Sequence, residues 1–285
     1  LRKRNVTTKN LGIQQGLGSA VPADATVVAV IGPATAFLAE EVQSLIGFYE
    51  RGGALLLALD PGVELGLGPL LAVLGVEYGE GTVLHERYHL RRDGGVTDRI
   101  LIGTSRYGSH PTVATTAKYK GQSSLLLPHS GFLKRKAGGE SNTQVVVLPM
   151  AGSWVDLDAD AEKDDGEPVE IEALAVATTR GKGETQGRAV VVADSDFLAD
   201  GILVNSANLQ FTLDVEAWLA RDDTTQLRAT SPEVDPPLVH TRDEDVAWFW
   251  ITVAGAPLLI FGVGMTFVGR RRRRRGPKGQ TGGSR

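Results

Sequence analysis

The longest charge-free stretch of the chain, residues 246–268, constrains the fold more than any other feature. It runs for 23 residues without Asp, Glu, Lys, Arg or His. A helix of that length rises about 34 Å, enough to cross the ~30 Å hydrocarbon core of a bilayer. Trp248, Phe249 and Trp250 stand at one end and Phe267 at the other, where aromatic rings meet lipid headgroups. We expect one membrane-spanning helix here, and a helix buried in a globular core is the alternative.

The charges that flank this stretch predict its orientation. The acidic sequence RDED precedes it, and six arginines follow it: Arg270, Arg271, Arg272, Arg273, Arg274 and Arg275. The positive-inside rule places arginines in the cytoplasm, and therefore residues 1–245 outside it. A basic run can also bind nucleic acid or anionic lipid, which is the alternative interpretation. The sequence thus predicts a protein of the bacterial inner membrane, in contact with lipid, with a periplasmic main domain.

The main domain is acidic and contains no cysteine. Eight of the 30 basic residues, but none of the 34 acidic ones, follow residue 268, which leaves 22 basic against 34 acidic residues in 1–245. A surface of this charge repels nucleic acid, so we expect no nucleic-acid partner. The lack of cysteine excludes thiol nucleophiles, disulfides and Cys-ligated zinc. The chain begins at Leu1 and shows no export signal, so we expect further sequence upstream.

Apolar patterns predict alternating strands and helices. Residues 25–32 (ATVVAVIG) and 54–62 (ALLLALDPG) are short buried runs that end in turn residues, typical of strands. Between them, residues 37–53 have apolar side chains at helical spacing and end in a glycine pair. Strand, helix and strand in this order predict a βαβ unit, and therefore an α/β domain with a parallel sheet.

The rest of the chain is less regular. We expect a short helix at 68–76, strands at 80–86, 99–103, 123–128, 143–149 and 171–179, a strand within 187–200 (GRAVVVADSDFLAD), and a further helix over 205–220. Residues 156–170 (DLDADAEKDDGEPVE) read as an exposed acidic loop. The predicted organisation is an extracytoplasmic domain at 1–228, a Pro-rich linker at 229–245, the spanning helix at 246–268 and a cytoplasmic Arg-rich tail at 269–285.

Several segments, taken in order, resemble the GldG-like family of gliding-motility-type ABC-transporter auxiliary proteins. They are VPADATVVAVIGP, YERGGALLLALDPG, HPTV, GSWVDLD, GRAVVVADSDFLAD and NSANLQFTLDVEAWL. The resemblance implies a flavodoxin- or class-I glutamine-amidotransferase-like sheet without catalytic residues, associated with an ABC-2-type permease and its separate ATPase subunit. Family members also have an N-terminal membrane helix and a first strand and helix that this sequence lacks.

Polar residues at strand ends are the candidate ligand-contacting groups. Asp194, Ser195 and Asp196 follow a buried strand, where α/β sheets place ligand contacts, and Asp60 and Ser153 end other apolar runs. Paired carboxylates can hold a cation or accept sugar hydroxyls. The alternative, which we favour, is that they cap turns and fix loop hydrogen bonds.

The sequence gives little support for a zinc site or a nucleotide-phosphate site. His85 and His89 lie four apart on an expected strand, about 13 Å from one another, too far to share zinc. The phosphate-binding pattern GxxxxGK[ST] is absent, so this chain is not the ATPase. We predict no catalytic residues, no metal site and no cofactor.

The predicted function is therefore that of a non-catalytic, membrane-anchored accessory subunit of an ABC-type transport system. Its periplasmic domain would contact permease or cargo, and small residues in the span would allow close helix packing: Gly255, Pro257, Gly262 and Gly264. The alternative is a cell-envelope module that binds carbohydrate or another polymer through its strand ends.

Overall fold

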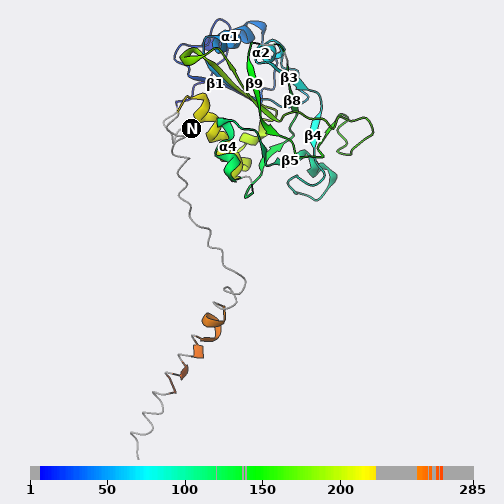
Figure 1. The fold of residues 1–285 in the computed structure, drawn as a ribbon, viewed down its shortest axis with the longest axis vertical. Coiled ribbons are helices and arrows are strands. Elements are labelled where there is room, and N and C mark those ends of the chain that lie inside the picture. Colours follow the sequence, from blue (N-terminus) through cyan, green and yellow to red (C-terminus); the bar gives the residue numbers. More distant parts are fainter. Residues whose placement is uncertain are drawn as a thin grey trace, which may run out of the picture. The chain divides into compact units, whose positions relative to one another are not determined.

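The computed structural model of the chain describes residues 7–222 except 120, 137 and 139, together with 249–255, 257–258, 261–262 and 264–265. The chain divides into two compact units, Leu1–Pro232 and Glu233–Arg285. The first unit contains the sheets and nearly all described helices (Figure 1).

A six-stranded sheet in the order β1-β2-β12-β11-β9-β6 forms the centre of the first unit. Its strands are β1 (Val27–Ile31), β2 (Ala54–Ala58), β12 (Gly187–Val192), β11 (Ala175–Arg180), β9 (Asn142–Leu148) and β6 (Arg106–Tyr107). The pairs β1–β2 and β2–β12 are parallel. The pairs β12–β11, β11–β9 and β9–β6 are antiparallel.

The βαβ unit expected near the start of the chain is confirmed. Helix α1 (Ala39–Glu50) connects β1 to β2, and the backbone N–H of Leu38 donates to the Glu41 carboxylate at 2.9 Å at its first turn. The helix buries Val42, Leu45 and Tyr49 against one face of the sheet. Apolar residues at this spacing lie on one side of a helix, which is why the local pattern identified it.

Helices cover both faces of the central sheet. Because side chains alternate along a strand, Leu55 and Leu57 of β2 face the core formed with α1 and α2 (Gly68–Val73), whereas Ala54 and Ala58 face the core formed with α4 (Ser206–Leu219). Leu55 and Leu57 are fully buried. Figure 1 shows α1 and α2 on the side of the sheet opposite α4. The short helix α3 (Asp200–Leu203) precedes α4.

The predicted parallel sheet is wrong. β11 and β12 are joined by only residues 181–186, and a parallel pair needs a crossover of about a dozen residues or more, so these strands must pair antiparallel. Most strand pairs of the unit are antiparallel, so the domain is a mixed α/β fold and not the flavodoxin- or glutamine-amidotransferase-like sheet that the family resemblance implied.

Three two-stranded antiparallel sheets complete the unit, and the sequence patterns did not predict their pairing. They are β10 (Trp154–Asp156) with β4 (Thr82–Leu84), β3 (Val76–Gly79) with β8 (Phe132–Arg135), and β5 (Leu101–Thr104) with β7 (Leu125–Pro128). The 3₁₀ helices are Ile13–Gln15, Val96–Ile100, Pro111–Val113, Thr116–Tyr119, Gly183–Thr185 and Asp196–Leu198. The paired strands of these three sheets lie tens of residues apart in the sequence, and strands this short have too few residues for a recognisable hydrophobic pattern.

The prediction of a spanning helix over residues 246–268 is wrong. Among the residues that the structure describes, no helix is long and apolar enough to cross a membrane. The described part of that stretch contains a π-helix at Ile251–Gly255 and helical residues at 249–250, 257–258, 261–262 and 264–265. Pro257 has no N–H to donate, and glycines such as Gly255, Gly262 and Gly264 are weak helix formers.

The predictions that depended on the spanning helix are wrong for the same reason. Localisation in a bacterial inner membrane, with a periplasmic main domain and a cytoplasmic tail, rested on the span and is not carried further. The remaining residues of the stretch and the six arginines Arg270, Arg271, Arg272, Arg273, Arg274 and Arg275 lie outside the described residues.

Candidate metal centre

Two of the predicted strand-end residues, Asp60 and Ser195, meet at the carboxyl ends of two neighbouring strands. Asp60 follows β2 and Ser195 follows β12, and these strands are parallel, so their carboxyl ends lie side by side. One carboxylate oxygen of Asp60 accepts the backbone N–H of Ser195 at 2.7 Å, and the other accepts the Ser195 hydroxyl at 2.7 Å. A Cβ on Gly32, whose φ is +51°, would lie 2.7 Å from the same hydroxyl oxygen. The close approach of β1 therefore requires glycine at this position.

Asp194 is fully buried and closes the turn after β12. Its carboxylate accepts the backbone N–H of Asp196 at 3.1 Å and that of Phe197 at 3.0 Å. Burial raises the pKa of Asp194 well above its ordinary range, and the charges of Asp196 and Asp60 add to this effect. These bonds are the turn-fixing contacts that the sequence analysis favoured over ligand binding.

Ser153 hydrogen-bonds elsewhere, in the turn before β10. Its hydroxyl donates to the carbonyl of Met150 at 2.9 Å, and within the described residues no hydrogen bond joins it to Asp60 or Ser195. The strand-end group therefore does not include it.

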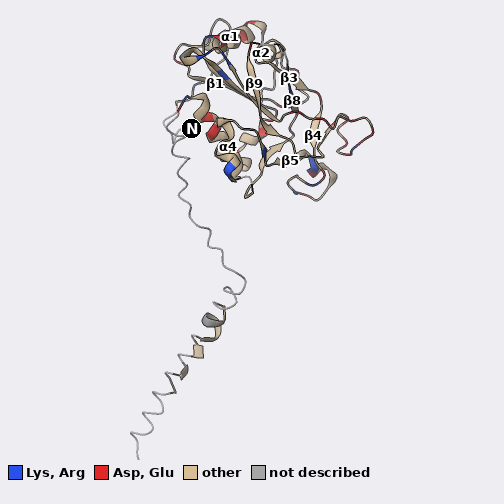
Figure 2. Cartoon of the chain, viewed as in Figure 1, with Lys and Arg blue, Asp and Glu red and all other residues tan. Residues whose placement is uncertain are grey.

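A second cluster lies in the acidic loop after β10, at a place that the sequence analysis read only as exposed. Asp156, the last residue of β10, is 4% exposed. One of its oxygens accepts the backbone N–H groups of Asp158 at 3.1 Å and Ala159 at 2.7 Å, and the other accepts that of Ala161 at 2.9 Å. The buried carboxylate thus folds the loop around itself. Acidic residues stand out along this part of the chain, near β4 (Figure 2).

The later acidic residues of the loop continue the same pattern. Asp158 accepts the N–H of Asp160 at 3.4 Å, and Asp160 accepts that of Glu162 at 2.7 Å. Glu167 returns to the start of the loop, where its carboxylate accepts the N–H of Leu157 at 3.1 Å, and it also accepts that of Asp164 at 3.0 Å. A carboxylate that binds the N–H two residues ahead turns the backbone inward at each step.

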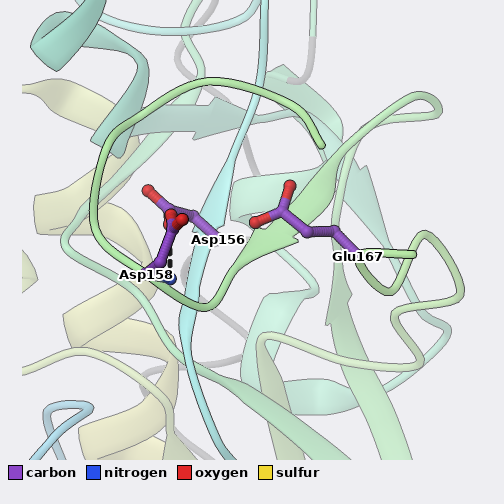
Figure 3. Close-up of side chains that lie close together, drawn as sticks. All are labelled: Asp156, Asp158 and Glu167. Carbon is purple, nitrogen blue, oxygen red and sulfur yellow. Dashed lines mark hydrogen bonds between the residues drawn. The ribbon is translucent and has the colours of Figure 1, made fainter. Parts of the chain in front are cut away.

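These turns bring carboxylates together. Oxygens of Asp156, Asp158 and Glu167 lie within 4.8 Å of one another, and so do oxygens of Asp158, Asp160 and Asp164. Figure 3 shows the carboxylates of Asp156 and Asp158 side by side and that of Glu167 turned toward them. Like charges at such a distance repel one another, and solvent screens this repulsion where the side chains are exposed.

Repulsion between the carboxylates raises the pKa of one residue of the cluster, Asp164. Asp160 raises the pKa of Asp164 above its ordinary value of 3.8, and burial and further acidic neighbours contribute. Lys163 is the only basic residue in 156–167. The cluster therefore carries negative charge that the loop itself does not neutralise.

The acidic residues follow the ligand spacing of a twelve-residue calcium loop. Oxygen-bearing side chains occupy positions 1, 3, 5, 7, 9 and 12, which are Asp156, Asp158, Asp160, Glu162, Asp164 and Glu167. Position 6, where such loops place glycine for a sharp turn, is Ala161, whose φ of +62° is the left-handed conformation that glycine adopts. The loop follows a strand and does not lie between two helices.

The donor set indicates which ion fits. All six side chains offer carboxylate oxygens, which suit the hard cations Ca²⁺ and Mg²⁺ and not metals that prefer sulfur or imidazole. The alternating D-x-D-x-D spacing was present in the sequence and could have found the loop. The prediction of no metal site considered only the hydrophilic character of these residues and not the spacing of their carboxylates.

Comparison with known proteins adds a likeness of fold. No family model matches the chain, and no curated protein matches it. A solved structure described as "mmIFT52 N-terminal domain" is similar, with a TM-score of 0.53 and 16% sequence identity over 68% of this chain and 77% of that chain. At this identity the similarity shows a shared fold and nothing about activity. The resemblance to the GldG-like family stays a prediction.

Proposed function

We propose that the globular unit is a Ca²⁺-binding module and that residues 156–167 hold the ion. The observation that carries this proposal is the twelve-residue spacing of Asp156, Asp158, Asp160, Glu162, Asp164 and Glu167, in a loop that folds around buried Asp156. Ca²⁺ takes six to eight oxygen ligands at about 2.3–2.6 Å, and the loop supplies carboxylates from both ends together with backbone carbonyls.

The electrostatics support the same conclusion. Converging carboxylates repel one another, and a divalent cation turns that repulsion into attraction at the same positions. Ca²⁺ tolerates irregular geometry and a high ligand number, whereas Mg²⁺ demands a near-ideal octahedron and retains several waters. A loop rich in carboxylates that lies partly open to solvent therefore favours Ca²⁺.

Calorimetric titration of the purified chain with Ca²⁺ and, separately, Mg²⁺ tests the proposal. We expect one Ca²⁺ site, with weaker Mg²⁺ binding, that Asp156→Asn abolishes. Asp165→Asn is the matched control, because it removes the same charge from the same loop at position 10, which carries no ligand. Equal loss in both variants would mean that only net charge matters, and an absence of binding at millimolar Ca²⁺ would disprove the proposal.

The role of an accessory subunit in an ABC-type transport system stays a prediction, as does the polymer-binding alternative. Co-purification with a permease and an ATPase would support the first, and binding on a glycan array in the presence of Ca²⁺ would support the second.

A further inference from the structure

The strand β1 forms one edge of the central sheet. It pairs with β2 on one side. Within the part of the chain that the structure describes, no strand, isolated bridge or loop pairs with its other side. An edge strand of this kind presents backbone N–H and C=O groups that can pair with a strand of another chain.

One hydrogen bond at the end of β1 shows which residues of the strand turn outward. The backbone N–H of Gly32 donates to the carbonyl of Ala58 in β2 at 3.0 Å, so the backbone of Gly32 points toward β2. The backbone groups of successive residues in a strand point to opposite sides, so Val27, Ala29 and Ile31 direct theirs away from β2. Each of these residues therefore offers one N–H and one C=O at the open edge.

The same residues also expose apolar side chains. Burial alternates along β1, with Val28 and Val30 in the core that includes α1 and the other three residues of the strand exposed. Val27 is 37% exposed and Ile31 is 51% exposed, although both side chains are large and apolar. The open edge thus combines free backbone groups with an apolar row on one face of the sheet.

The two edges of the sheet differ in how they are protected. At the far edge, β6 consists of Arg106 and Tyr107 alone. A very short strand and a charged side chain both hinder pairing with another sheet. β1 has neither device, because residues 25–39 contain no Asp, Glu, Lys, Arg or His, the strand contains no proline, and its register with β2 is unbroken.

We propose that β1 pairs with β1 of a second copy of this chain, antiparallel about a two-fold axis at Ala29. In this register Val27 lies opposite Ile31 of the partner subunit at both ends, and Ala29 lies opposite Ala29 of the partner subunit. The outward backbone groups then form two hydrogen bonds in each of three residue pairs, and the two central sheets become one.

The distribution of charge favours a second copy as the occupant of this edge. In a two-fold interface, a charged residue near the axis meets its own like charge, and residues 25–39 contain none. Residues 1–245 as a whole carry 34 acidic against 22 basic groups, so two copies repel one another over much of their surface. The uncharged edge is where they can approach, and it offers a charged partner nothing to recognise.

The size of the contact indicates a weak dimer. Strands of five residues are about 17 Å long, so the paired edges cover less than the ~800 Å² per partner of a standard protein interface. We expect a dissociation constant on the order of tens of micromolar. Sedimentation velocity of the full chain, at concentrations above and below this value, measures it.

Variants at the edge test the register. Ile31→Lys should weaken the dimer at least about tenfold, because each dimer contains the contact between residues 27 and 31 twice. Val204→Lys is the matched control, since Val204 is 85% exposed and lies outside β1, and it should leave the dissociation constant unchanged. Adding Val27→Glu to Ile31→Lys should restore the dimer to within a few-fold, because the introduced carboxylate then faces the introduced ammonium at both ends.

The rescue by the double variant separates a lost contact from a damaged fold, and circular dichroism checks the fold of each protein. A monomer at every concentration, or a dimer that Ile31→Lys leaves unchanged, would refute the proposal. Slow hydrogen exchange of β1 in a monomeric protein would assign the edge to another segment of the chain and would also refute it. Failure of Val27→Glu to rescue the dimer would refute the antiparallel register.

Discussion

Replacement of Asp156 by asparagine should weaken the fold and remove its response to Ca²⁺. The carboxylate of Asp156 accepts three backbone N–H groups, from Asp158, Ala159 and Ala161. Asparagine keeps one acceptor oxygen and turns the other into an NH₂ donor. If the oxygen stays on Asp158 and Ala159, the NH₂ group faces the N–H of Ala161, and that donor loses its partner.

The expected magnitudes follow from this geometry. A buried N–H without a partner costs about 1–3 kcal/mol, so the variant should be less stable by this amount even without cation. Saturating Ca²⁺, at about 100 times its dissociation constant, should stabilise the wild-type chain by about 2.7 kcal/mol. In a domain of this size each kcal/mol raises Tm by about 2–4 °C, so Ca²⁺ should raise the wild-type Tm by roughly 5–11 °C.

Thermal unfolding with EGTA and with Ca²⁺ measures both effects in one experiment. Asp156→Asn should unfold at lower temperature in EGTA and show no Ca²⁺-dependent rise, whereas Asp165→Asn should show the full rise. A variant at Asp156 that keeps the wild-type shift with Ca²⁺ would show that this carboxylate is not a ligand. An unchanged Tm in EGTA would show that its three hydrogen bonds contribute little.

Three further outcomes test the same reasoning. Ala159→Gly should stabilise the chain by about 0.5–1 kcal/mol in chemical unfolding, because Ala159 is exposed and has a φ of +67°, which glycine adopts without strain. Because the pKa of Asp164 is raised in the fold, its ionisation costs stability as pH rises through that pKa. The cation-free wild-type chain should therefore lose stability relative to Asp164→Asn over this pH range, and Ca²⁺ should remove the difference. An equal pH dependence of stability in the two proteins without Ca²⁺ would contradict this prediction. Gly32→Ala should destabilise the chain by about 1–3 kcal/mol without altering Ca²⁺ binding, because its Cβ would lie 2.7 Å from the Ser195 hydroxyl oxygen at a positive φ.

The contact between Asp60 and Ser195, which lies outside the proposed Ca²⁺ site, was accessible from sequence order alone. Asp60 and Ser195 end strands in a βαβ pattern, and the rule that ligand-contacting groups gather at carboxyl ends brought them into one prediction. The structure places them in direct contact, since β2 and β12 are parallel neighbours. The rule does not distinguish a ligand site from a hydrogen-bonded turn, and Ser153, selected by the same reasoning, lies in another turn.

The wrong predictions concern segments whose local sequence pattern is compatible with more than one tertiary structure. The apolar runs of β11 and β12 look the same in a parallel and an antiparallel sheet, and only the six residues between them decide the direction. Residues 246–268 have the length and composition of a membrane helix, yet no helix among the described residues is long and apolar enough to cross a membrane.

The sequence by itself determined the local elements and the chemistry available. Periodic apolar residues specified α1, α4 and the buried strands, and the composition of 156–167 supplied six carboxylates at fixed intervals. Only the tertiary structure decided which strands pair and which carboxylates meet. Asp156 anchors the loop because β10 pairs with β4 and buries its end, and burial forces the carboxylate to take its partners from the backbone of the loop.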